Sequence, residues 1–263
     1  MIKLRYIQVF VMLLIGVGGI LHAQDTLYEA KRFIKAQDTL QYRIMYPEMF
    51  DSTKSYPLVL FLHGAGERGN DNISQLAHGS RLFASEEHRK EFPAIVIFPQ
   101  CPKSSYWANV EVDRSTNPIG LEFPINTEPT TALNMVMQLV DSMALEPFVK
   151  KEHMYVGGLS MGGMGTFEIL YRKPDRFAAA FAICGAGNPE GTQRFAETTP
   201  LWIFHGAKDD VVNPQASVAM VSGILKYGGK PNFTLYAKDN HNSWDTAFAE
   251  PELLSWLFSN SKS

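Results

Sequence analysis

Residues 158–162 of the chain read GLSMG, a serine between two glycines. A short apolar run, residues 154–156, precedes this pentapeptide, and a helix-like stretch over residues 163–172 follows it. A strand, a Gly-x-Ser-x-Gly turn and a helix in this order are typical of a nucleophile elbow, in which the serine stands on a sharp turn above a sheet. Glycine is needed because the turn leaves little room for side chains. The pattern predicts that Ser160 lies at a helix N-terminus, where the helix dipole favours developing negative charge.

The first 23 residues are predicted to be a secretory signal peptide. Residues 1–6 carry two basic side chains and no acidic one, residues 7–21 are almost entirely apolar, and Ala23 offers a small residue for cleavage. The alternative is an uncleaved anchor helix, but the apolar run is short for a bilayer span, which needs roughly 20 residues. We therefore expect a secreted or periplasmic protein with no stable membrane anchor after cleavage, and a catalytic domain over residues 24–263.

Composition places this domain among ordinary globular proteins, because 45% of the 263 residues are hydrophobic and 19% are charged. The length is enough for one domain with a sizeable core. The formal net charge is −3, and removal of Lys3 and Arg5 with the signal peptide makes it more negative. A mildly acidic chain lacks the basic surface of a nucleic-acid-binding protein, so nucleic acid is not expected among its partners.

Apolar runs and helix-like stretches alternate along the chain. A plausible hairpin comes first, and six further strands and four helices follow: strands at 32–36, 39–46, 57–62, 94–98, 155–156, 178–184, 201–204 and 232–237, and helices at 131–145, 163–172, 214–227 and 251–258. Continuous apolar runs are typical of strands that are buried on both faces. The order predicts an α/β fold with a mostly parallel sheet and helices on both faces.

A serine hydroxyl needs a base to remove its proton, and the base needs a third group to fix its tautomer. Only His205 and His241 follow the elbow, and the usual chain order on this scaffold is serine, acid, histidine. His241 lies in a polar loop after the last strand and is our candidate base. His205 ends an apolar strand and is expected to be a packed or hydrogen-bonded residue there. Asp209 is our candidate acid, with Asp210 as the alternative.

Acyl transfer also requires N–H donors that are aimed at the oxyanion. One is expected from the backbone of Met161, the residue after the serine. The other is expected from residues 63–69, HGAGERG, where small residues let backbone N–H groups approach a substrate. Ala65 is the preferred donor there, and Gly64 and Gly66 are the alternatives.

Residues 101–129 form a long stretch with four prolines and little periodicity. A loop of this length is usually functional, and this one starts at the end of a strand, where open α/β sheets bind ligands. Trp107 in this stretch and Trp244 beside His241 are candidate substrate-binding residues that could form an aromatic wall, although either could serve simple packing. The chain has no Cys/His cluster with metal-ligand spacing, so we expect neither a metal nor another cofactor.

The stretches HGAGERG, IFPQCP, GLSMGGMG, HGAKDDVV and HNSWDTAF together resemble the α/β-hydrolase superfamily over residues 30–260. Within it they are similar to secreted esterases related to the feruloyl and acetyl-xylan esterases of carbohydrate esterase family 1 and to polyhydroxybutyrate-depolymerase-like proteins. The resemblance implies a triad of Ser160, Asp209 and His241 and an eight-stranded sheet in the order 1-2-4-3-5-6-7-8. It implies a serine carboxylesterase whose partner is a small-molecule or polysaccharide-linked ester.

Prolyl-oligopeptidase-type catalytic domains share much of the same pattern, so a serine peptidase is the alternative. A non-catalytic binding protein on the same scaffold is a further alternative, but such proteins typically lose a member of the triad. Asn240 stands where relatives often carry glycine before the histidine, and asparagine also tolerates tight turns. Residues 185–200 are too few for the large lid of many lipases, which predicts an open site.

The two cysteines, Cys101 and Cys184, are predicted to be free thiols even in an exported protein. Each follows a different strand, and the strand order that the resemblance implies separates those strands by three positions. At roughly 4.8 Å per position, this distance is about twice the reach of a disulfide.

Overall fold

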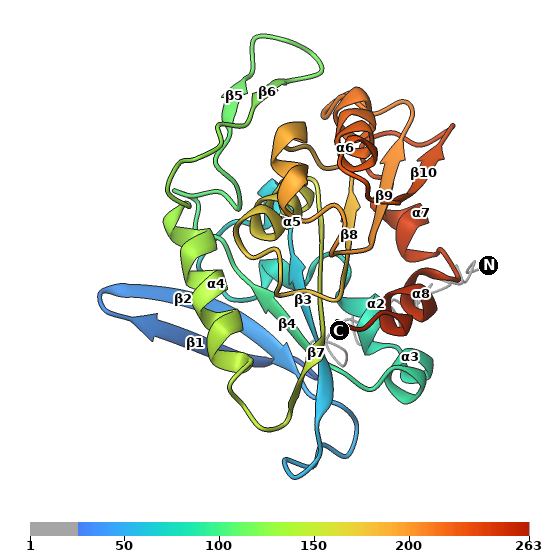
Figure 1. Cartoon of the computed structure of the whole chain (residues 1–263). Helices are drawn as coiled ribbons and strands as arrows, with labels where there is room; N and C mark the ends of the chain where they lie inside the picture. The colour runs from blue at the N-terminus through green and yellow to red at the C-terminus, as the bar shows by residue number, and fades with distance from the viewer. Residues whose placement is uncertain (1–25, 263) are drawn as a thin grey trace, which may run out of the picture.

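The computed structural model describes residues 26–262, so the predicted signal peptide lies outside the described residues. These residues form an eight-stranded sheet with helices on both faces (Figure 1). Across the sheet the strands are β1 (Glu29–Lys35), β2 (Asp38–Met45), β4 (Ile95–Pro99), β3 (Tyr56–Leu62), β7 (Val149–Leu159), β8 (Ala179–Ile183), β9 (Leu201–Gly206) and β10 (Asn232–Tyr236).

The pairing is antiparallel from β1 to β2 and from β2 to β4, and it is parallel across the rest of the sheet. Counted in chain order within this sheet, the strands follow the order 1-2-4-3-5-6-7-8. The predicted fold class and strand order are therefore confirmed.

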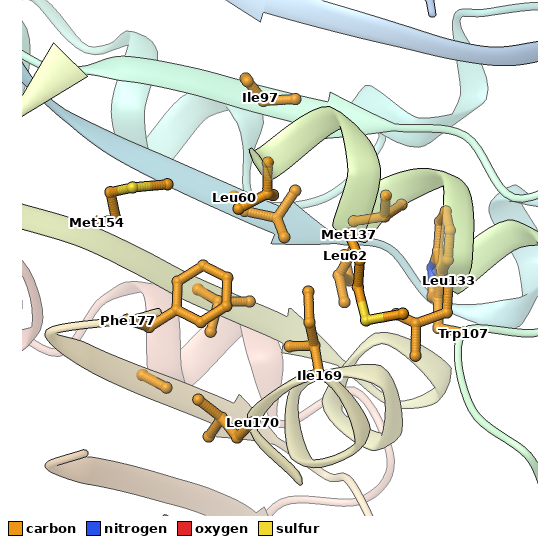
Figure 2. Packing of buried hydrophobic residues seen from close by; sticks show 14 of the residues in the cluster. Leu60, Leu62, Ile97, Trp107, Leu133, Met137, Met154, Ile169, Leu170 and Phe177 are labelled. Carbon is orange, nitrogen blue, oxygen red and sulfur yellow. The ribbon is translucent and has the colours of Figure 1, made fainter. Parts of the chain in front are cut away.

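Two apolar cores lie on opposite faces of the sheet, and successive residues of β3 alternate between them. Leu60 and Leu62 pack into one core, and Val59 and Phe61 into the other. This alternation is the period of two that a pleated strand imposes. Helices α4 (Thr131–Met143), α5 (Met161–Arg172) and α6 (Gln215–Lys226) cover the first face, and α2 (Ser80–Ala84), α3 (Glu86–Glu91), α7 (Trp244–Phe248) and α8 (Leu253–Ser259) cover the second (Figure 1). Figure 2 shows the first core, in which side chains from β3, α4 and α5 meet.

The stretch that resisted assignment, residues 101–129, contains a small hairpin of its own. Strands β5 (Glu111–Asp113) and β6 (Gly120–Glu122) pair with each other and stand apart from the main sheet, at the top of Figure 1. The Ile119 N–H donates to the Val211 carbonyl over 3.1 Å. That contact ties the hairpin to the loop after β9, at the carboxyl end of the parallel strands.

Both cysteines are free, as predicted, and the structure shows that both are buried. Cys101 follows β4 and Cys184 follows β8, and strands β3 and β7 lie between them. Within the part of the chain that the structure describes, no helix has the length and apolar character that a bilayer crossing requires.

Candidate active site

The turn between β7 and α5 places Ser160 at φ 51° and ψ −116°, a strained conformation for a residue with a side chain. Its N–H donates to the Ile183 carbonyl over 2.8 Å. A Cβ at Gly162 would overlap the carbonyl oxygen of Leu62, and a Cβ at Gly158 would overlap the carbonyl oxygen of Gly162. Both flanking positions therefore require glycine, which explains the pentapeptide in physical terms.

Ser160, His241 and Asp209 are joined by hydrogen bonds. Ser160 Oγ lies 3.0 Å from His241 Nε2, and His241 Nδ1 lies 2.8 Å from Asp209 Oδ2. A carboxylate can only accept, so Nδ1 carries the imidazole proton and Nε2 is left to accept from the serine hydroxyl. Asp210 is exposed and does not make this contact. Of the two aspartates that the sequence offered, the structure brings Asp209 to the histidine.

The Asp209 side chain is fully buried and accepts four hydrogen bonds. Oδ1 accepts from the N–H groups of Val211 and Val212, each over 2.9 Å. Oδ2 accepts from His241 and also from His205 Nε2 over 3.1 Å. Burial alone would raise the pKa of the Asp209 carboxyl, but the hydrogen bonds from His205 and His241 outweigh it and hold the pKa well below its usual range.

His205 is the residue of this network that the sequence reasoning missed. It is buried at the end of β9, as predicted, and it also contacts the acid four residues later. The signal that could have found it is the spacing of a strand-end histidine and an aspartate in the tight turn that follows, which brings the two side chains to the same edge of the sheet.

Ala65 and Met161, the two predicted oxyanion donors, line one cavity together with Ser160, and so do Gly64 and Gly66. Met161 is the first residue of α5, so its N–H has no acceptor within the helix. Ala65 begins a short 3-10 helix, Ala65–Glu67, directly after β3. The arrangement brings both backbone segments to the serine.

His63 holds the start of the loop that carries Ala65, residues 63–69. Its Nδ1 donates to the Gly64 carbonyl over 2.6 Å, and its Nε2 accepts from the Cys101 N–H over 3.0 Å. Burial lowers the pKa of His63 to about 4, so the ring is neutral near pH 7 and holds one tautomer. Arg68 adds a donor from Nε to the Ala65 carbonyl over 3.1 Å. The loop is therefore held in place before any substrate arrives.

The cavity beside Ser160 has a volume of about 290 Å³, and two kinds of side chain line it. The apolar ones come from the β5–β6 hairpin, from α5 and from the loop after β9: Val112, Ile119, Leu121, Met164, Val211 and Val212. The polar and aromatic ones are Glu67, His78, Tyr106, Arg114 and Trp244. The Trp244 ring stands edge-on to His241, with ring centroids 5.4 Å apart. Trp244 thus lines the cavity, and its part in substrate binding stays a prediction.

Trp107 does not line this cavity, and its assignment as a substrate-binding residue is wrong. Its side chain is 0% exposed, and its Nε1 donates to the His63 carbonyl over 3.1 Å. The ring packs in the first core beside Leu62 and Leu133 (Figure 2). The indole lies against α5, where a Cβ added at Gly165 would meet the Trp107 side chain at 2.5 Å. The packing alternative is the correct one.

Three potential metal ligands lie together in the site, since atoms of Cys184, Asp209 and His241 fall within 4.8 Å of one another. Burial, and then the negative charge of Asp209, raise the pKa of the Cys184 thiol. Two of the three side chains, Asp209 and His241, are hydrogen-bonded to each other through Oδ2 and Nδ1 over 2.8 Å.

Several known proteins, esterases and peptidases among them, are similar to this chain. The bifunctional acetylxylan esterase/xylanase XynS20E of Neocallimastix patriciarum is 28% identical over 170 residues, which cover 65% of this chain and 21% of that protein. Lysophospholipase-like protein 1 of Mus musculus is 24% identical over 211 residues, which cover 76% of this chain and 84% of that protein. The crystal structure of a thermostable esterase has a TM-score of 0.80 and 32% identity, covering 91% of this chain and 64% of that one.

The chain therefore spans about a fifth of XynS20E and just under two thirds of the thermostable esterase. The family model for phospholipases and carboxylesterases matches residues 120–251, half of the chain. That segment contains Ser160, Asp209 and His241. The match, the strand order and the geometry around the serine lead to one assignment: the chain belongs to the phospholipase/carboxylesterase family, with the α/β-hydrolase fold.

Proposed function

We propose that the protein is a serine carboxylesterase and that Ser160, His241 and Asp209 are its catalytic triad. The observation that carries the proposal is the pair of hydrogen bonds from Ser160 Oγ to His241 Nε2 and from His241 Nδ1 to Asp209 Oδ2, at 3.0 and 2.8 Å. These distances are within the range for proton transfer between a nucleophile and its base. The family match supports the same reaction class.

The reaction follows from the positions of the groups. Ser160 Oγ attacks the ester carbonyl carbon while its proton moves to His241 Nε2, and Asp209 stabilises the resulting imidazolium. The N–H groups of Ala65 and Met161 hold the negative oxygen that forms. His241 then gives the proton to the leaving alkoxide, which departs as the alcohol. A water molecule, deprotonated by the same histidine, attacks the acyl-enzyme, and release of the acid restores the serine.

We further propose that the substrate carries an acetyl or feruloyl group on a carbohydrate. The apolar side chains of the cavity suit a short or aromatic acyl group. The polar and aromatic ones suit a hydroxyl-rich alcohol, because Glu67 can accept hydrogen bonds and Trp244 offers a flat apolar face. The similarity to XynS20E supports this substrate class. Export through the predicted signal peptide would bring the enzyme to such a polymer.

The proposal is tested by hydrolysis of an ester panel with the mature chain: p-nitrophenyl acetate, butyrate and decanoate, methyl ferulate and acetylated xylan. Ser160→Ala is the control for each substrate. Serine-dependent turnover of acetyl or feruloyl esters, with poor turnover of the decanoate, is the expected result. Turnover of short peptide amides without turnover of any ester would refute the esterase assignment and favour a peptidase.

A further inference from the structure

We infer that His205 is a positioning residue that holds the Asp209 carboxylate in place for His241; this inference rests on the proposed function. His205 ends β9, and its side chain is 0% exposed. Among the described residues that line the cavity, His205 is absent. Any effect of His205 on the reaction must therefore act through the residues that it contacts, Asp209 and the turn up to Val212.

The neighbours of the His205 ring determine where its proton lies. Nε2 faces two groups that can only accept, Asp209 Oδ2 at 3.1 Å and the Val212 carbonyl at 3.0 Å. Nε2 must carry a proton, because otherwise three acceptors would face one another in a buried site. Nδ1 lies 2.7 Å from Ser217 Oγ, whose single proton can point to this nitrogen or to the Gly185 carbonyl at 3.2 Å. The proton on Nε2 therefore follows from its own two acceptors, and His205 donates to Asp209 whichever way the Ser217 hydroxyl points.

Both imidazoles donate a hydrogen bond to Asp209 Oδ2. His241 approaches over 2.8 Å from the loop after β10, and His205 approaches over 3.1 Å from β9. Oδ1 is already bound by two backbone N–H groups. A carboxylate offers about four acceptor sites, so His205 occupies the last of them. Without His205 the buried carboxylate loses one of its four donors.

The same ring also ties down the turn that carries Asp209. Its bond to the Val212 carbonyl closes residues 209–212 against the end of β9. The titratable groups that face the carboxylate are His205, His241 and the Cys184 thiol at the end of β8. Since the thiol pKa is raised by burial, the thiol stays neutral near pH 7. The two imidazoles are therefore the side chains whose donors the Asp209 carboxylate depends on.

A matched pair of variants separates positioning from packing. His205→Gln places an amide N–H near the position of Nε2 and keeps a donor for Asp209. His205→Asn reaches only as far as Nδ1, so it can contact Ser217 and leaves Asp209 without the donor. Ser217→Ala is the control, because it removes the contact at Nδ1 and leaves Nε2 facing Asp209. Each variant is compared with the parent for p-nitrophenyl acetate hydrolysis and for thermal unfolding.

We expect His205→Asn to lower kcat by about 10- to 100-fold, the size of effect that a small misplacement of a catalytic group produces. Its KM should stay within about threefold of the parent, because no substrate contact is lost. The acid limb of its kcat/KM profile should move to higher pH, since a carboxylate with fewer donors attracts the His241 proton more strongly. His205→Gln and Ser217→Ala should retain kcat within about fivefold of the parent, with the acid limb in place.

Two kinetic results would overturn the inference. One is a His205→Asn enzyme with the kcat and pH profile of the parent, and the other is equal losses in the Asn and Gln variants that follow their unfolding temperatures. An independent test is the imidazole ¹⁵N NMR spectrum of the Ser160→Ala protein, in which His205 should have a protonated Nε2. An unprotonated Nε2 would refute the inference. This spectrum decides even if His205→Asn does not fold or the parent hydrolyses no ester, so failure of the inference and failure of the proposed function remain distinguishable.

Discussion

Replacement of Asp209 by asparagine is the sharpest perturbation of this site, because the carboxylate is enclosed by donors. Two backbone N–H groups point at Oδ1 and two imidazole nitrogens point at Oδ2. An asparagine has one oxygen and one NH₂ group. Whichever way the amide is turned, its NH₂ group faces two N–H donors. The variant therefore cannot satisfy its surroundings in either orientation.

The magnitude follows from the number of orphaned donors. Two buried donors without a partner cost about 1–3 kcal/mol each, so Asp209→Asn should lose roughly 2–6 kcal/mol of stability. For a chain of this size that corresponds to a fall in Tm of roughly 4–24 °C. If the NH₂ group faces His241, the imidazole proton moves to Nε2, which can no longer accept from Ser160. A wrong tautomer of this kind lowers kcat by about 10⁴ in serine hydrolases with a Ser-His-Asp triad.

The assay is kcat/KM for p-nitrophenyl acetate, measured well below the Tm of each protein, together with thermal unfolding by circular dichroism. Asp210→Asn is the matched control, because the adjacent carboxylate is exposed. We expect that control to behave like the parent in both measurements. An Asp209→Asn enzyme within about tenfold of the parent activity, or a larger loss in Asp210→Asn, would refute the reasoning.

The same carboxylate makes a prediction for acid stability. Its pKa is lower in the folded protein than in the unfolded chain, so it stabilises the fold above the unfolded-state value of about 3.9. This contribution is lost as the pH falls further, towards the folded-state pKa. The difference in unfolding free energy between the parent and Asp209→Asn should therefore shrink below about pH 4. Urea titrations at several pH values measure it, and a difference that grows on acidification would contradict the assignment.

Three further predictions concern the elbow, the cavity wall and the thiols. Gly162→Ala should prevent formation of the elbow and lower the Tm strongly. Gly66→Ala should leave the Tm unchanged, because its Cβ would meet no atom within 4 Å. Equal effects of the two substitutions on the Tm would contradict the steric argument. Trp244→Ala should raise KM for methyl ferulate about fivefold, which corresponds to the loss of about 1 kcal/mol of aromatic contact. The measurement is the dependence of the hydrolysis rate on methyl ferulate concentration, and an unchanged KM would contradict the prediction. Cys101 and Cys184 should react with a thiol reagent only after unfolding. Burial raises the pKa of the Cys101 thiol to about 12 and also raises the pKa of the Cys184 thiol. Fast labelling of the native protein would contradict this prediction.

Much of the site could be predicted because its parts are encoded locally. The glycines around Ser160 reflect contacts within one turn and with the strand beside it, so the pentapeptide reports the elbow directly. The apolar runs report strands that are buried on both faces, and their alternation with helices is enough to predict a parallel sheet. The chain order of Ser160, Asp209 and His241 then follows from the scaffold.

Other features depended on contacts between residues far apart in the chain. Trp107 and Trp244 both follow the ends of core segments and look alike as candidates, yet one is fully buried and the other lines the cavity. The β5–β6 hairpin has strands of three residues each, too short to show a period. Its place at the cavity depends on a bond to the loop after β9.

By itself the sequence determined the elbow, the parallel sheet and the order of the catalytic candidates, because residue size, backbone freedom and burial leave local patterns. Only the tertiary structure decided which aspartate meets His241, that His205 shares that carboxylate, and which tryptophan reaches the cavity. Those outcomes depend on the directions in which loops leave the strands. Such directions are set by packing and hydrogen bonds between distant segments, and no short stretch of sequence records them.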